Sequence, residues 1–208
     1  MGAEKEAREK LVRELKSEGY LKTENVIRAF GKVNRKNFVL KEHEQIAYAD
    51  YPLPIPGNVT ISAPHMHAIV LELLDLSNDD DVLEVGFGSG ILLAYIAEIV
   101  KSGKITGTEI KKETYEFGKK NLGRCCRGIV ITNEDITRES PGKKQKFDKI
   151  VVSAAAKTIP EELVKLLKNN GRMIIPVGDY FQNLVVIEKK GKKITKKNMG
   201  GVAFVPLE

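Results

Sequence analysis

The segment from Asp81 to Ile91 constrains the fold of this chain more than any other. It holds a short apolar run, three glycines at alternate positions, and then apolar residues at helical spacing. The run Val82–Val85 predicts a buried strand, and the pattern after Gly90 predicts a helix. A strand that turns through glycines into a helix lets backbone N–H groups approach a ligand closely. The segment therefore predicts a βα unit that can bind a polar or anionic ligand, although many such turns need glycine for steric reasons alone.

A carboxylate at the end of the next predicted strand favours a nucleoside as that ligand. Residues 104–110 predict this strand, and Glu109 lies nineteen residues beyond Gly90. An acidic residue about 20 residues after the glycine turn can accept hydrogen bonds from ribose hydroxyls. The glycine pattern is G-x-G-x-G, and Glu84 stands two residues before it. This pattern is shorter than the G-x-G-x-x-G fingerprint of a nicotinamide dinucleotide site.

The rest of the chain alternates between predicted strands and helices. Further strands are expected at 129–132, 147–153 and 173–177, helices at 89–101, 112–122 and 160–168, and an antiparallel pair at 184–188 and 202–205. This order predicts an α/β fold, a doubly wound, mostly parallel seven-stranded sheet with an antiparallel edge hairpin. Helices at 4–16 and 24–33 and an irregular, proline-rich stretch at 34–59 precede a helix that opens at Pro64. We expect one domain over 1–208, with 1–60 as an N-terminal helical and loop cap and 61–208 as the cofactor-binding core.

Composition limits the environment and the partners. The chain has 208 residues, 42% of them hydrophobic and 30% charged, which suits one well-buried globular domain. Its apolar runs fall short of the ~18 residues that span a bilayer, and its charged N-terminus does not resemble a signal peptide, so we expect no membrane and a cytoplasmic location. Adjacent Cys125 and Cys126 predict free thiols. The net charge is +6, and lysines are concentrated around Lys143–Lys144 and in 189–197. Because such lysine runs are usually solvated faces, nucleic acid is an unlikely partner.

Two features at the start of the helix that opens at Pro64 have purely structural interpretations. Ser62 could be only a helix-capping residue, which is the commonest role for serine at such a position. His65 and His67 are two residues apart, so on a helix they point in different directions, and we predict no metal site.

Longer motifs narrow the function by resemblance. The segment Glu84–Gly90 resembles the first motif of the Rossmann-like methyltransferases that use S-adenosyl-L-methionine. Three further blocks, at 60–68, 148–156 and 200–207, resemble hallmarks of the protein-L-isoaspartate O-methyltransferase family, in its archaeal form. The resemblance covers the chain from about Phe38 to Leu207.

This resemblance implies transfer of a methyl group from S-adenosyl-L-methionine to the free α-carboxylate of L-isoaspartyl residues in damaged proteins, as a step of protein repair. S-adenosyl-L-homocysteine is the product. It implies Ser62 as the catalytic residue and Ala63, His67 and Gln182 as substrate-binding residues. The cofactor-binding residues that it implies are Ile61, Ser62, Glu84, Gly86, Gly88, Gly90, Glu109, Ile110, Asp135, Ile136 and Ala154.

Several residues depart from the family pattern around the expected cofactor. Phe87 replaces a small polar residue, Glu134 and Ile136 flank Asp135 where the family has glycines, and Asn58–Val59 replaces Gly-Gln. Two alternatives therefore stay open: a methyltransferase that acts on RNA, and a non-catalytic binding module of the same fold. The chain lacks the Asn/Asp-Pro-Pro-aromatic motif of amine methylation, and its cysteines do not follow a proline.

Overall fold

The fold is organised around one seven-stranded sheet. A computed structural model describes residues 2–136 and 145–208. The sheet has the strand order β5-β4-β3-β6-β7-β8-β9. The strands are β3 (Val82–Val85), β4 (Ile105–Thr108), β5 (Ile129–Thr132), β6 (Phe147–Val152), β7 (Leu167–Val177), β8 (Gln182–Lys190) and β9 (Lys193–Val202).

The direction of the strands confirms the fold class that the sequence predicts. β3 pairs in parallel with β4 and β6, and the parallel pairing continues outward to β5 and β7. β8 and β9 then add in antiparallel fashion. The chain order reverses beside β3, which is the position where open α/β sheets bind ligands at the carboxyl ends of their strands.

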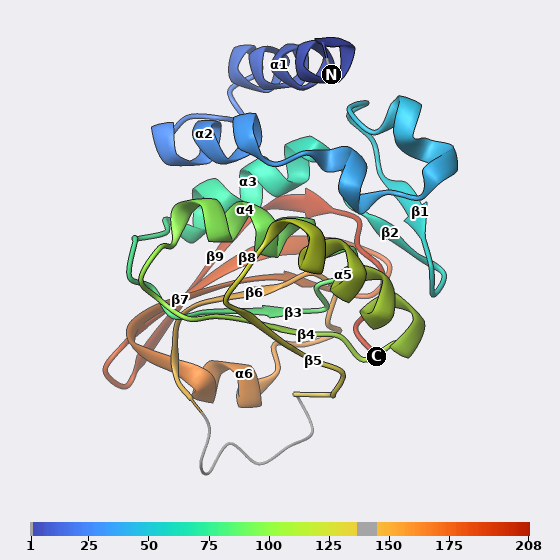
Figure 1. Cartoon of the computed structure of the whole chain (residues 1–208). Helices are drawn as coiled ribbons and strands as arrows, with labels where there is room; N and C mark the ends of the chain where they lie inside the picture. The colour runs from blue at the N-terminus through green and yellow to red at the C-terminus, as the bar shows by residue number, and fades with distance from the viewer. Residues whose placement is uncertain (1, 137–144) are drawn as a thin grey trace.

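Helices cover both faces of the sheet (Figure 1). One face carries α1 to α5, and α6 lies on the other. The first group packs a large apolar core that includes Leu15, Phe30 and Tyr95, whereas Leu163 and Leu166 of α6 pack against the opposite face. The helices are α1 (Gly2–Ser17), α2 (Glu24–Lys32), α3 (Pro64–Leu74), α4 (Ile91–Ile99), α5 (Lys112–Cys125) and α6 (Glu161–Leu166).

The stretch expected to be irregular holds short ordered elements. It contains the 3₁₀ helices η1 (Arg35–Phe38) and η2 (Lys41–Ile46) and the strand β1 (Leu53–Ile55), which pairs with β2 (Val59–Ile61). The β1–β2 hairpin docks on α5, where the Thr114 hydroxyl donates to the carbonyl of Pro56 at 2.9 Å. A Cβ at Gly57 would lie 2.2 Å from that hydroxyl, so the close approach requires glycine.

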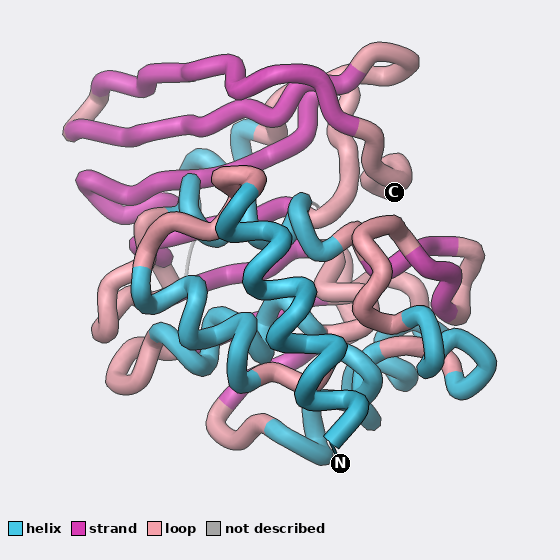
Figure 2. Tube along the Cα trace, turned by 90° about the horizontal axis from the view of Figure 1, so that it is seen from above, coloured by secondary structure: helices cyan, strands magenta, loops and turns pink. Residues whose placement is uncertain are grey.

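Two boundaries near the C-terminus differ from the sequence prediction. The last strand is 193–202 rather than 202–205, because β9 pairs with β8 along the lysine-rich segment. α6 ends at Leu166, and β7 begins at Leu167, six residues earlier than predicted, in register with Phe147 of β6. Tertiary pairing decided both boundaries. Figure 2 shows these antiparallel strands extending beyond the helices.

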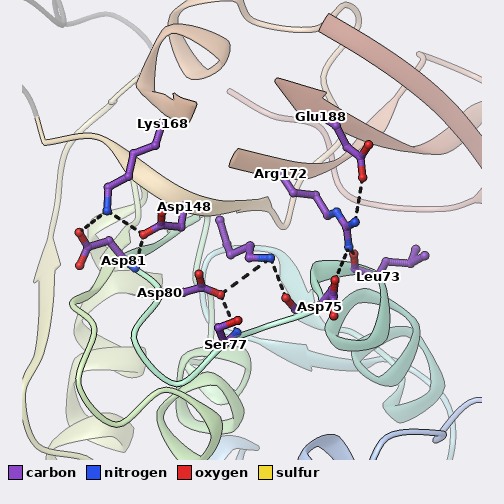
Figure 3. A network of polar contacts seen from close by, with 10 residues as sticks. Leu73, Asp75, Ser77, Asp80, Asp81, Asp148, Lys168, Arg172 and Glu188 are labelled. Atoms are coloured by element: carbon purple, nitrogen blue, oxygen red, sulfur yellow. Dashed lines mark hydrogen bonds and ion pairs between the residues drawn. The ribbon is translucent and has the colours of Figure 1, made fainter. Parts of the chain in front are cut away.

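Ion pairs join the amino ends of β3, β6 and β7, opposite the expected site (Figure 3). Lys168 Nζ lies 2.8 Å from Asp81 Oδ2 and 2.7 Å from Asp148 Oδ2. Arg172 pairs in the same region with Asp75 and Glu188. These contacts connect neighbouring strands and take no part in the ligand site.

Other expectations from composition can be compared with the structure. Both cysteines are free, as predicted. Most lysines of 189–197 are exposed, whereas Lys143 and Lys144 lie outside the described residues. Within the described ranges, no helix has the length and apolar character needed to cross a membrane.

Candidate functional site: three joined cavities at the carboxyl ends of the strands

The glycine turn after β3 brings backbone amides next to a carboxylate. Gly86, Gly88 and Gly90 have φ values of 77°, 54° and 85°, a region that favours glycine. The N–H of Gly88 donates to Glu109 Oε2 at 3.1 Å, and the N–H of Lys111 donates to Oε1 at 3.1 Å. Glu109 is therefore fixed at the end of β4 and faces the turn.

The three glycines have different surroundings. Gly86 and Gly88 line the cavities described below, whereas Gly90 does not. Gly90 is the N-cap of α4, and a Cβ there would lie 2.7 Å from the side chain of Leu122. Its position thus serves the packing of α4 against α5, and the cofactor contact expected of Gly90 stays a prediction.

A strand-end cavity lies where β3, β4, β5 and β6 end. It encloses about 630 Å³ of space that is partly open to solvent. The β1–β2 hairpin and residues 205–208 of the C-terminal segment close its sides. Seven residues expected to bind the cofactor line it: Gly86, Gly88, Glu109, Ile110, Asp135, Ile136 and Ala154.

A buried cavity continues inward from the same glycines and contains Glu84. Its space of about 470 Å³ is also partly open to solvent, and Ile61, Ser62 and His67 line it too. Glu84 is 1% exposed, and its Oε1 accepts a hydrogen bond from the Ser153 hydroxyl at 2.7 Å. Among the described residues, its Oε2 has no hydrogen-bond partner of normal geometry.

Burial sets the protonation state of both ionisable groups in this cavity. Desolvation raises the pKa of Glu84 to about 8; the hydrogen bond from Ser153 offsets part of this rise, and the charge of Glu109 adds to it. Desolvation, together with the positive charge of Arg35, lowers the pKa of His67 well below its ordinary value. His67 is therefore a neutral imidazole. It lies beside the buried cavity and not in the outer one, so its expected contact with substrate stays a prediction.

An outer cavity opens from these two toward the surface. It encloses about 1370 Å³ and is lined by Ser62, Ala63 and Gln182, three of the residues expected at the reaction site. Thr60 and Ser153 line all three cavities, and Ser62 lines the buried and the outer one. The cavities are therefore one continuous site, and Ser62 lies where its inner and outer parts meet.

Ser62 is fixed from behind by a buried arginine. Arg35 is 0% exposed, and its Nη2 donates to the carbonyl oxygen of Ser62 at 2.8 Å while its Nε donates to the carbonyl of Ala47 at 2.8 Å. The N-cap of α3 is Ala63, whose own side chain makes no capping hydrogen bond. Ser62 is thus not the capping residue that its sequence position allowed.

Gln182 has a structural contact that the sequence did not reveal. Its Nε2 donates to the carbonyl of Phe204 at 3.0 Å, and its Oε1 accepts from the N–H of Phe204 at 2.6 Å. The side chain thereby fixes the C-terminal segment against the outer cavity. Sequence reasoning missed Thr60 and Ser153 as site residues, although both stand inside the quoted motif blocks.

Phe87 departs from the family pattern without blocking the turn. Its ring is 3% exposed and lies 5.9 Å from the ring of Tyr115. Cβ atoms at Gly107 and Gly118 would lie 3.0 Å and 2.6 Å from it, so these glycines leave room for the ring. Ile136, another departure, lines the strand-end cavity and is 7% exposed.

The donors and acceptors of the site fit an adenosyl-amino acid. Glu109 lies where a ribose can bind, and the uncompensated Glu84 oxygen is suited to an ammonium group. With the strand order of the sheet, this defines a protein of the class of Rossmann-like, S-adenosyl-L-methionine-dependent methyltransferases.

Comparison with known proteins identifies the family. The profile of the protein-L-isoaspartate(D-aspartate) O-methyltransferase family matches residues 5–208, and the chain belongs to that family. A protein-L-isoaspartate O-methyltransferase of the archaeon Pyrococcus horikoshii is 47% identical over 98% of this chain and 95% of its own length. The one of Thermococcus onnurineus is 47% identical over 94% of this chain and 90% of its own length.

A solved structure agrees with the sequence comparison. A Plasmodium falciparum protein assigned as a protein-L-isoaspartate O-methyltransferase, in complex with S-adenosyl-L-homocysteine, aligns with a TM-score of 0.86. It is 32% identical to this chain, and the alignment covers 96% of this chain and 97% of that one.

Proposed function

We propose that this protein transfers the methyl group of S-adenosyl-L-methionine to the free α-carboxylate of L-isoaspartyl residues in damaged proteins, as a step of cytoplasmic protein repair. One methyltransferase domain, residues 1–208, acts without a metal ion. The observation that carries the proposal is the position of Ser62, which lines both the buried cavity that holds Glu84 and the outer cavity that opens to the surface.

Two carboxylates at opposite parts of the site would hold the cofactor. Glu109 would accept hydrogen bonds from the ribose hydroxyls, and Asp135 and Ile136, which line the strand-end cavity at the end of β5, would contact the adenine. Glu84 would bind the ammonium of the methionine portion through its Oε2. When bound, the cofactor supplies an electrophilic methyl group on a sulfonium.

The residues of the outer cavity position an already ionised nucleophile. A carboxylate with a pKa near ~3.5 needs no strong general base at neutral pH. The hydroxyl of Ser62 donates a hydrogen bond to one carboxylate oxygen while the other is aimed at the methyl group. Such positioning can lower a barrier by about 7–11 kcal/mol in favourable systems.

Isotope-labelled cofactor tests the proposal on three acceptors. Label should enter an isoaspartyl peptide and neither its aspartyl counterpart nor bulk tRNA. Label in tRNA alone would favour an RNA methyltransferase, and calorimetry that shows no heat with S-adenosyl-L-methionine would favour a non-catalytic module.

Substitution of Ser62 then tests the role of its hydroxyl. Ser62→Ala should lower kcat about a hundredfold while binding of S-adenosyl-L-homocysteine and thermal stability stay near wild type. Ser17→Ala is the matched control, because Ser17 lies exposed at the end of α1. Wild-type turnover of the Ser62→Ala variant would refute the catalytic role.

A further inference from the structure

A histidine on the wall of the outer cavity is held by a carboxylate on another segment. His65 lies in the first turn of α3, and its Nδ1 is 3.0 Å from Oδ1 and 3.0 Å from Oδ2 of Asp50. The backbone N–H of His65 also donates to Asp50 Oδ1, at 2.9 Å. Asp50 lies in the loop that follows η2. These contacts fix both the ring and the start of the helix.

The pairing leaves one ring nitrogen for another partner. Because the Asp50 carboxylate accepts hydrogen bonds only, it favours the form of His65 with its proton on Nδ1. In the described part of the chain, the hydrogen bonds of this ring engage Nδ1 and not Nε2. The imidazole lines the outer cavity beside Ser62 and Ala63, and its side chain is 32% exposed.

The remaining wall of this cavity carries no formal charge. Among the described residues that line it, there is no lysine, arginine, aspartate or glutamate. His65 is therefore the one basic side chain of this described wall. The substrate proposed for this cavity is an anion, and the wall otherwise offers it hydroxyl, amide and apolar groups.

We propose that His65 is a substrate-binding residue whose imidazolium Nε2–H donates to the α-carboxylate of the isoaspartyl residue, and that Asp50 is the positioning residue that holds the ring. This inference rests on the proposed function and deepens it. A charge-assisted hydrogen bond is stronger than a neutral one. The hydrogen bond from His65 would add to the one from Ser62. Asp50 supplies the negative charge behind the ring, so the cation is not left without a counter-ion.

The proposal predicts that substrate binding depends on His65 and that cofactor binding does not. The groups that face His65 are Asp50, the ring of Tyr20 at 5.4 Å between centroids, the neutral His67 on the same helix, and Tyr180 on the same cavity wall. Loss of the imidazole should therefore raise KM for an isoaspartyl peptide and leave the affinity for the cofactor unchanged.

Steady-state kinetics of His65→Gln tests the assignment. The amide keeps a neutral hydrogen-bonding group but cannot carry a positive charge, so KM for the peptide should rise about tenfold. Its kcat and its affinity for S-adenosyl-L-homocysteine should stay near wild type. His43→Gln is the matched control, since His43 lies in η2 and does not line the cavity.

Asp50→Asn and a measurement on the wild type complete the test. Asp50→Asn removes the charge behind the ring, so KM should rise in the same direction by a smaller factor. In the wild type, the NMR signal of His65 Nε2 should shift when a saturating, non-methylated isoaspartyl peptide binds, which requires no substitution. A wild-type KM in folded His65→Gln, or an Nε2 signal that the peptide leaves unchanged, would overturn the proposal. If the wild type itself methylates no isoaspartyl peptide, the proposed function fails and takes this inference with it.

Discussion

Binding of the cofactor should release a proton from Glu84. Burial holds the pKa of this carboxyl at about 8, so it is mostly protonated in the empty site at pH 7. An incoming ammonium favours the ionised carboxylate, which then forms a charge-assisted hydrogen bond through Oε2. The proton must therefore leave when the cofactor binds.

The size of the effect follows from the pKa. At pH 7 a group with a pKa of about 8 is roughly nine-tenths protonated, so binding should release about 0.9 proton. Ionising it at pH 7 costs about 1.4 kcal/mol, which weakens the apparent affinity about tenfold. Between about pH 6 and pH 7 the Kd should accordingly fall nearly tenfold.

Calorimetry measures both quantities. Titration of S-adenosyl-L-homocysteine in buffers of different ionisation enthalpy gives the number of protons released. Repetition from about pH 6 to 7.5 gives the slope of Kd against pH. This range lies below the one in which an α-amino group titrates. Glu84→Gln should abolish the proton release and the slope, and it should bind the ligand more weakly. A wild-type Kd that is constant over this range, with heats independent of the buffer, would refute the reasoning.

The same substitution should affect stability in the opposite direction. The pKa of Glu84 is higher in the folded than in the unfolded chain, so the unfolded state ionises first as the pH rises from about 4.5. Folding is thereby destabilised by roughly 3 kcal/mol at pH 7. Glu84→Gln should remove much of this cost, although the buried amide that replaces the carboxyl has a desolvation cost of its own. Thermal denaturation at pH 5 and pH 7 would show that the gain in stability grows with pH.

Three further substitutions test the packing and the ion pairs. Gly118→Ala should destabilise the protein by about 1–3 kcal/mol and weaken cofactor binding, because the new Cβ would lie 2.3 Å from the carbonyl oxygen of Gly88. A Cβ at Gly123, on the same helix, would have no atom within 4 Å. Gly123→Ala should therefore stabilise the protein by up to about 1 kcal/mol. Lys168→Met removes the cation that lowers the pKa of Asp81, and should lower the free energy of unfolding by about 1 kcal/mol at pH 7. The unfolded state protonates this aspartate first as the pH falls, so the difference from wild type should shrink as the pH drops below about 4. Equal denaturation curves for both glycine variants, or a Lys168→Met deficit that persists in acid, would contradict these accounts.

Local sequence patterns place the residues expected to bind the cofactor more directly than those expected to bind the substrate. Glu84 and Glu109 stand next to glycines or at a strand end, and parallel pairing then brings such positions to one edge of a sheet. His65 gave a weaker signal, because its significance depends on Asp50, fifteen residues earlier in a segment without regular periodicity. Gln182 lines the outer cavity, and only the structure shows that its amide is hydrogen-bonded to the backbone of Phe204.

The sequence alone determined the order of α1 to α6 and of the seven strands of the main sheet, though not the β1–β2 hairpin, as well as the position of the glycine turn and the motifs that show the family. These are local patterns, set by burial periodicity and by the residues that tolerate positive φ. Only the tertiary structure decided that Gly90 supports packing whereas Gly86 and Gly88 line the site. It also decided that Ser62 lines both the buried and the outer cavity, and that Glu84 is mostly protonated at neutral pH. Each of these depends on desolvation and on contacts between residues far apart in the chain, which no local pattern encodes.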